Sequence, residues 1–138
     1  MDFFTVLKIG GSALSAQRIR LNVIATNLAN IHTTRTPEGG PYRRRDVVFR
    51  SQPMGFEGVL RSLQGVRVVG VIKDSRPFPV VYNPSHPDAD EEGYVRMPNV
   101  NLMEEMTNLI LAARSYEAAA AVIATARDMA LRILEIGR

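Results

Sequence analysis

Proline is confined to the middle of this chain. All eight prolines lie between residues 37 and 98, and so do seven of the ten glycines. Because proline removes a backbone donor and clashes inside a helix, a long helix is not expected to cross that stretch. The two ends lack proline, so each can form one long helix. The partition predicts a helix in residues 1–33, an irregular or β-rich middle in 34–98 and a second helix in 99–138.

The N-terminal segment carries an apolar residue at every seventh position. The heptad leucines are Leu7, Leu14, Leu21 and Leu28, and Phe3, Ile24 and Ile31 fill much of the second apolar position. This spacing is typical of a coiled-coil helix. Gly10 and Gln17 interrupt the second position, and glycine destabilises a helix interior. We therefore expect one long helix that is weakened in its first turns.

The C-terminal segment has a helix start signal and a long apolar stripe. Asn101 can cap the helix, and Glu104 can complete a capping box. The stripe runs through Leu102, Met106, Leu109, Ala113, Tyr116, Ala120 and Ile123, and then shifts to Val122, Ala126, Met129, Ile133 and Ile136. The many alanines favour helix and permit close approach of a partner helix. We expect an α+β fold in which the two terminal helices form an antiparallel coiled-coil-like pair.

The middle segment is expected to form a small β-rich module. Its β-compatible runs are residues 46–50, 66–72, 79–82 and 94–97, and turn residues separate them. The segment has few large apolar residues, so we expect it to lean on the helices.

Apolar residues also lie off the predicted helix seam. A two-helix hairpin buries one seam only, which leaves side chains such as Phe4, Ile19, Leu111 and Leu131 outside it. Either other subunits cover these residues, or the β-rich module folds back over them in a monomer. The pattern favours assembly.

Several stretches of the chain resemble one protein family. Residues 12–30 resemble the N-terminal signature of the axial proteins of the bacterial flagellum, the family of rod and hook proteins. Residues 33–44, 81–101 and 104–118 are similar to a rod-protein version of that family. Ala119 and the Ile31-His32 pair depart from the usual family pattern, which affects local contacts only.

The resemblance implies a non-enzymatic structural subunit of the flagellar rod. The implied partners are copies of the same chain, other rod proteins and the proteins that join the rod to a membrane ring. The resemblance also implies a periplasmic place in the basal body, transmission of torque, and export by the flagellar type III apparatus without a cleaved signal. The alternative is a soluble helical-hairpin adaptor or binding module.

Other kinds of protein and site are disfavoured by the residues themselves. The chain has no cysteine, two histidines and no Gly-x-Ser-x-Gly elbow, so we expect no cofactor, thiolate metal site or catalysis. The acidic run at residues 88–92 is interpreted as a solvated loop, although a cation site was the alternative. Arg43-Arg44-Arg45 is interpreted as a subunit contact, because no basic face or stacking motif indicates nucleic acid.

No secretory signal peptide and no membrane-spanning segment are expected. The first residues lack a basic region followed by a long apolar run. The apolar stretch at residues 109–126 carries Arg114 and Glu117, which argues against direct membrane insertion.

The residues expected to contact other subunits lie mostly on the two helices. Asn27 and Asn30 have two interpretations: a polar group that sets the register of a seam, or, for Asn30, a simple helix end in the left-handed conformation. Tyr116 is expected in the seam and Arg114 on the outside. The full predicted set is Leu14, Leu21, Ile24, Asn27, Leu28, Asn30, Tyr42, Arg43, Leu102, Met106, Leu109, Tyr116, Ile123, Met129 and Ile133.

Overall fold

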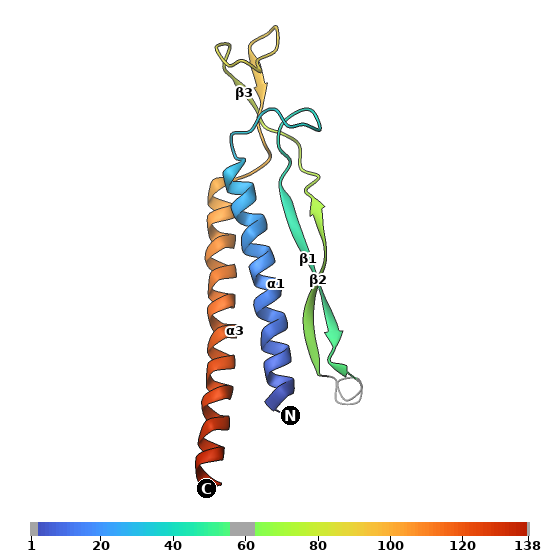
Figure 1. The fold of residues 1–138 in the computed structure, drawn as a ribbon. Helices are drawn as coiled ribbons and strands as arrows, with labels where there is room; N and C mark the ends of the chain where they lie inside the picture. The colour runs from blue at the N-terminus through green and yellow to red at the C-terminus, as the bar shows by residue number, and fades with distance from the viewer. Residues whose placement is uncertain (1–2, 56–62, 138) are drawn as a thin grey trace.

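The computed structural model describes residues 3–55 and 63–137 and shows an elongated molecule (Figure 1). Helix α1 spans Phe3–Ala29 and helix α3 spans Leu102–Ile136. The two helices lie side by side and run in opposite directions, so the N- and C-terminal ends of the chain lie toward the same end of the molecule. This arrangement confirms the expected α+β fold with an antiparallel pair of terminal helices.

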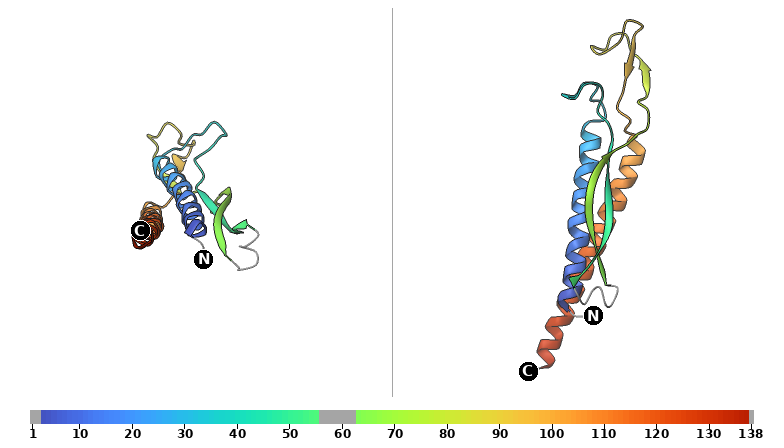
Figure 2. Two further views of the ribbon diagram at one scale, coloured as in Figure 1. Left: turned by 60° about the horizontal axis from the view of Figure 1, so that its bottom comes forward. Right: turned by 90° about the vertical axis from the view of Figure 1, so that its right-hand side faces the viewer.

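The middle of the chain forms two separate antiparallel hairpins. The strands are β1 (Arg45–Pro53), β2 (Gln64–Lys73), β3 (Val80–Tyr82) and β4 (Tyr94–Arg96). Strand β1 pairs with β2, with a register shift between Val48 and Phe49, and β3 pairs with β4. The long hairpin lies along α1 on the side away from α3, and the short hairpin extends beyond the helices (Figures 1 and 2). The predicted runs are strands, but β1 continues farther than expected.

Helix α1 is packed between α3 and the long hairpin. Its buried residues are Gly10, Ala16, Ile24 and Asn27. On the hairpin side, the Ser12 hydroxyl accepts a hydrogen bond from the Val66 amide at 3.1 Å. The long hairpin therefore packs on the N-terminal helix, as expected. It covers part of the helix surface that does not face α3. Phe4 and Leu111 nevertheless remain 65% and 54% exposed.

The start of the C-terminal helix matches its capping signal in part. Asn101 is the N-cap, and its side chain accepts a hydrogen bond from the Glu104 amide at 3.1 Å. The Glu104 carboxylate does not return the exchange predicted for a capping box. It accepts two hydrogen bonds from Arg76 instead, because the end of β2 brings that guanidinium close to the helix start.

Gly10 marks a close approach between α1 and α3. The helix is continuous through Gly10 and Gly11, and Gly10 is buried. A Cβ atom at residue 10 would lie 2.7 Å from Cγ1 of Ile123, which is closer than carbon atoms pack. The sequence alone presents Gly10 as an interruption of the apolar stripe. In the structure, the missing side chain provides the space for α3.

The two adjacent glycines provide a matched pair of substitutions. Gly11→Ala is expected to stabilise the protein by up to about 1 kcal/mol, because alanine favours helix and the new methyl group meets nothing within 4 Å. Gly10→Ala gains the same propensity but must displace Ile123, so we expect a net loss of about 1 kcal/mol. Urea denaturation followed by circular dichroism measures both. Equal stability of the two variants would show that the helices do not approach closely at residue 10.

Helix α3 is long and apolar enough to cross a membrane, judged by length and composition alone. The expectation that no segment meets this description is therefore wrong. Arg114 and Glu117 form an ion pair at 2.9 Å on the surface of this helix. Only 11% of the most apolar window of α3 is buried within the chain. Length and composition are weak evidence for a membrane span, and they fit a helix that packs against other proteins equally well.

Candidate assembly surface

Large apolar side chains are exposed along the whole length of α3. They are Leu102, Met103, Met106, Ile110, Leu111, Val122, Met129, Leu131, Ile133, Leu134 and Ile136. Among the described residues, α1 is the one element that packs extensively against α3. Because monomeric proteins rarely expose so much contiguous apolar surface, this helix is the main candidate for a contact with other proteins.

The C-terminal end of α3 extends past the start of α1 (Figures 1 and 2). The antiparallel register places Gly10 against Ile123, so the last residues of α3 pass beyond Phe3. A groove of about 580 Å³ lies between the two helices near this end. It is lined by Phe3, Val6, Ala121, Val122, Thr125, Ala126, Met129, Ala130 and Ile133. Leu134 and Ile136 are 68% and 86% exposed on the extension itself.

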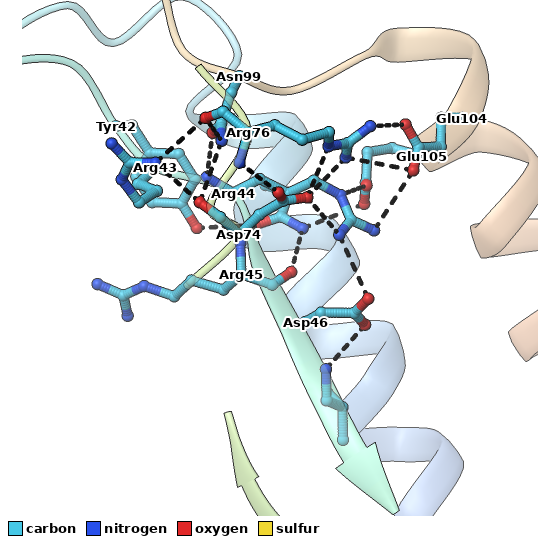
Figure 3. Close-up of polar contacts among 12 residues, drawn as sticks. Tyr42, Arg43, Arg44, Arg45, Asp46, Asp74, Arg76, Asn99, Glu104 and Glu105 are labelled. Atoms are coloured by element: carbon cyan, nitrogen blue, oxygen red, sulfur yellow. Dashed lines mark hydrogen bonds and ion pairs between the residues drawn. The ribbon is translucent and has the colours of Figure 1, made fainter. Parts of the chain in front are cut away.

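A buried polar junction holds α1, α3 and the start of β1 together at the opposite end of the helical pair (Figure 3). Asn27 is fully buried at its centre. Its side-chain amide donates to the Arg45 carbonyl at 2.8 Å and to the Glu105 carboxylate at 3.1 Å. Its side-chain oxygen accepts from the Tyr42 hydroxyl at 2.9 Å and from the Arg45 amide at 3.0 Å. All hydrogen-bonding groups of this side chain are therefore used within the chain.

The charged centre of the junction is an ion pair between Arg44 and Glu105. The Glu105 side chain is fully buried, and Arg44 is 6% exposed. The Arg44 guanidinium donates from Nε to Glu105 and lies 3.3–3.4 Å from the carboxylates of Asp46 and Asp74. Burial disfavours the charged guanidinium, but the hydrogen bonds and charges of Glu105 and Asp46 together outweigh this effect and raise the pKa of Arg44. Each buried charge thus has an opposite charge in contact.

A second layer joins the end of β2 to the same junction. The Asn99 side-chain oxygen accepts from the Arg44 amide at 2.7 Å, and its amide group donates to the Arg76 carbonyl at 3.0 Å. Arg76 donates to the Asp74 carboxylate at 2.8 Å and bridges to Glu104. The hydrogen bonds from Arg76 lower the pKa of Asp74 to about 2. The junction therefore connects both helices with both strands of the long hairpin.

The predicted contact residues fall into three groups in the structure. Leu14, Leu21, Leu28, Asn30, Arg43, Leu109 and Ile123 are half-buried, and Ile24, Asn27 and Tyr42 are buried. Leu102, Met106, Tyr116, Met129 and Ile133 are exposed in the single chain. The exposed group can contact another subunit directly. The buried residues lie inside the protomer. They would therefore contribute to assembly only indirectly, by holding the protomer in the conformation that its neighbours contact.

Three of the polar residues in the predicted contact set have defined surroundings. Asn27 is buried and donates a hydrogen bond to Glu105 of α3. That it sets the register of a seam stays a prediction. Helix α1 ends at Ala29, and the Asn30 side chain donates to the Thr26 carbonyl at 2.8 Å. Arg43 donates to the Asp74 carbonyl at 2.8 Å and stacks on the Phe78 ring. These residues primarily order the chain around them.

The sequence did not reveal the role of Arg44, Asn99 and Glu105. Glu105 lies four residues after the N-cap Asn101 and looks like an ordinary charge in a first helical turn. Its burial follows from the phase of the seam on α3, which passes through Glu105, Leu109, Ala112, Ala119, Ile123 and Ala126. The buried face of α3 is hard to recognise in the sequence, because small alanines form much of it and the larger apolar residues lie on the outer face. Spacing of alanines at three and four residues was the available signal.

Among the described residues, no group of three or more histidine and acidic side chains could hold a metal ion. In the acidic loop, Asp88 forms an ion pair with Arg35 and accepts a hydrogen bond from Thr34 at 2.7 Å. The Thr34 hydrogen bond is the main cause that lowers the pKa of Asp88.

Two terminal helices with one outer face exposed define a subunit of a larger assembly, and comparison with known proteins identifies the class. Residues 7–35 match the family described as flagella basal body rod protein. Residues 91–136 match the family described as flagellar basal body rod FlgEFG protein C-terminal. The two matched ranges contain most of α1 and all of α3. The chain is thus a flagellar basal-body rod protein.

Relatives similar over their whole length identify the particular family. A flagellar basal-body rod protein FlgC of Yersinia enterocolitica is 44% identical over 140 residues, covering 100% of both chains. The FlgC protein of Borreliella burgdorferi is 41% identical over 151 residues, covering 98% of this chain and 99% of its own. That of Bacillus subtilis is 39% identical over 150 residues. The chain belongs to the FlgC family and is a structural subunit of the rod in the flagellar basal body.

Proposed function

We propose that this subunit assembles through the outer face of α3, packing it against the helices of neighbouring rod subunits. The observation that carries the proposal is the row of exposed apolar residues that extends from Leu102 to Ile136. Covering this row with another helix would remove large apolar side chains from water, which is the dominant favourable term in protein association. The groove near Phe3 and the extension of α3 provide one place for such a helix.

The neighbours that we propose are copies of this chain and other rod proteins, with a junction to a membrane ring at one end. The family resemblance also supports a periplasmic position and export by the flagellar type III apparatus. We propose no direct membrane insertion for α3, because its apolar face would be covered by protein. A catalytic role is not proposed, since rod proteins are structural components. The similarity to FlgC proteins over the whole chain disfavours the helical-hairpin adaptor.

Transmission of torque would depend on the polar junction as well as on the exposed face. The junction ties the long hairpin to both helices through buried hydrogen bonds and an ion pair. A force applied to the hairpin would therefore pass to the helices without a flexible joint. The helices would then distribute the load over many contacts with neighbouring subunits.

The test places a charge on two exposed apolar positions of α3, one alongside α1 and one on the C-terminal extension. Leu111→Asp and Leu134→Asp are expected to abolish rod assembly and swimming, because each would bury a carboxylate in a subunit contact. Both leucines are more than half exposed in the single chain, so the free energy of unfolding should change by no more than about 0.5 kcal/mol. Basal bodies isolated from the cells and urea denaturation of the free protein measure the two effects.

The matched control is Glu135→Lys, which changes the charge beside Leu134 but removes no apolar group. Cells with this control should swim. Intact rods and normal swimming with both leucine variants would contradict the proposed surface.

A further inference from the structure

A basic pocket lies beside the polar junction, on the outside of the chain. Four cationic side chains line it, namely Arg35, Arg43, Arg45 and Lys73, and its volume is about 510 Å³. Glu38 is the one acidic residue among the lining residues, and it pairs with Lys73. The Lys73 hydrogen bond and charge lower the pKa of Glu38, so this carboxylate is ionised and neutralises the lysine.

Two of the guanidinium groups in the pocket have no carboxylate of the described residues in contact. Arg43 donates to two backbone carbonyls and lies over the Phe78 ring at 4.2 Å. Arg45 is exposed, and its guanidinium lies 5.8 Å from the centre of the Tyr42 ring. Within residues 3–55 and 63–137, neither guanidinium forms an ion pair. The pocket therefore presents uncompensated positive charge to the outside.

The loop between β3 and β4 carries the opposite charge. Its acidic residues are Asp88, Asp90, Glu91 and Glu92. Asp88 is occupied by Arg35, and Asp90 accepts hydrogen bonds from the amides of Glu92 and Tyr94, which form the turn. Glu91 and Glu92 are both exposed and form no ion pair within the described part of the chain. The turn thus holds two free carboxylates at its outer edge.

The basic pocket and the acidic turn lie next to each other at the same end of the molecule, because Asp88 and Asp90 line an adjoining pocket that shares Arg35 and Pro41 with the basic one. In the right-hand view of Figure 2, the loop that includes residues 35–41 and the β3–β4 hairpin leave the helical pair in different directions. No residue of the turn lines the basic pocket of its own subunit, so the two complementary surfaces can pair between copies. Where such a contact is head-to-tail, its repetition forms rings or helical filaments.

We propose that the Glu91-Glu92 turn of one copy docks into the Arg43-Arg45 pocket of the next copy. This inference rests on the proposed function, since it names one contact within the assembly. The chain carries a net charge of +3, so copies repel each other overall, and an acidic turn aimed at a basic pocket selects one orientation. A free anion would fill the pocket but would leave the two carboxylates of the turn unpaired.

Cross-linking in cells that build flagella tests the contact directly. The chain has no cysteine, so Arg45→Cys combined with Glu92→Cys introduces the only two thiols. A short bismaleimide reagent is expected to give dimers and higher multiples of the full chain on a denaturing gel. Arg50→Cys with Glu92→Cys is the matched control, because Arg50 is an exposed arginine farther along the same strand. The control should give no multiples.

Charge exchange provides a second measurement that does not depend on the thiols. Arg45→Glu and Glu92→Arg should each reduce the number of swimming cells by about tenfold, through like-charge repulsion at the contact. The combined variant should recover at least half of the swimming cells, whereas Arg50→Glu should swim normally. Single variants that swim normally, or a combined variant no better than either one, would overturn the proposal.

The remaining outcomes also decide between explanations. A cross-link from residue 45 or 92 to a different rod protein would replace the second copy by another partner and overturn the inference. If Leu111→Asp abolishes assembly while both charge reversals leave rods intact, the proposed function holds and this contact fails. If the charge exchange behaves as expected while Leu111→Asp assembles, the contact stands and the proposed α3 surface fails.

Discussion

Replacing Glu105 with alanine is expected to destabilise the free protein by about 3–5 kcal/mol, because it leaves a buried guanidinium without its partner. Arg44 would keep only the longer contacts to Asp46, Asp74 and Glu104. Asn27 would also lose the acceptor of one of its amide hydrogen bonds. Since stability of small domains is only about 5–15 kcal/mol, this loss should expose the start of α3 to proteases. Urea denaturation and limited proteolysis with mass spectrometry measure the two effects.

The control is Glu117→Ala, which removes another carboxylate from the same helix. Glu117 pairs with Arg114 on the surface, where the two side chains are 63% and 77% exposed. Pairs of this kind contribute about 0–1 kcal/mol. An equal loss of stability in the two variants would show that the Arg44–Glu105 pair is accessible to water and that the junction does not hold the helices.

Ile24→Asp is expected to cost about 4 kcal/mol or more and to prevent rod assembly. Ile24 is 4% exposed, so the new carboxylate would be buried without an opposite charge in contact. Ala25→Asp is the matched control, because Ala25 is exposed on the same turn of α1. It should cost less than about 1 kcal/mol, mainly through helix propensity. Thermal denaturation and swimming assays compare the two variants.

Related substitutions should show a graded effect. Leu21 and Leu109 are half-buried, so Leu21→Asp and Leu109→Asp should destabilise the free protein less than Ile24→Asp. A fully stable Ile24→Asp protein that still builds normal rods would contradict the packing of α1 against α3.

The sequence determined the elements of this protein and its family. The absence of proline at both ends, the heptad leucines and the cap at Asn101 are local signals, and the helices and strands follow them closely. The middle segment also packs against the helices, as expected. Helix propensity, capping and alternation act between residues close in the chain, so one sequence is enough to recognise them.

Only the tertiary structure decided which face of each helix is buried and which distant residues form the buried polar junction. Gly10 and the alanines of α3 form the seam because small residues let the helix axes approach. This leaves larger residues such as Met106 and Ile133 outside. The Arg44–Glu105 pair joins residues 61 positions apart, and no local pattern marks such a partner. Burial depends on which distant surfaces meet, and that physical information exists only once the helices and hairpins are assembled.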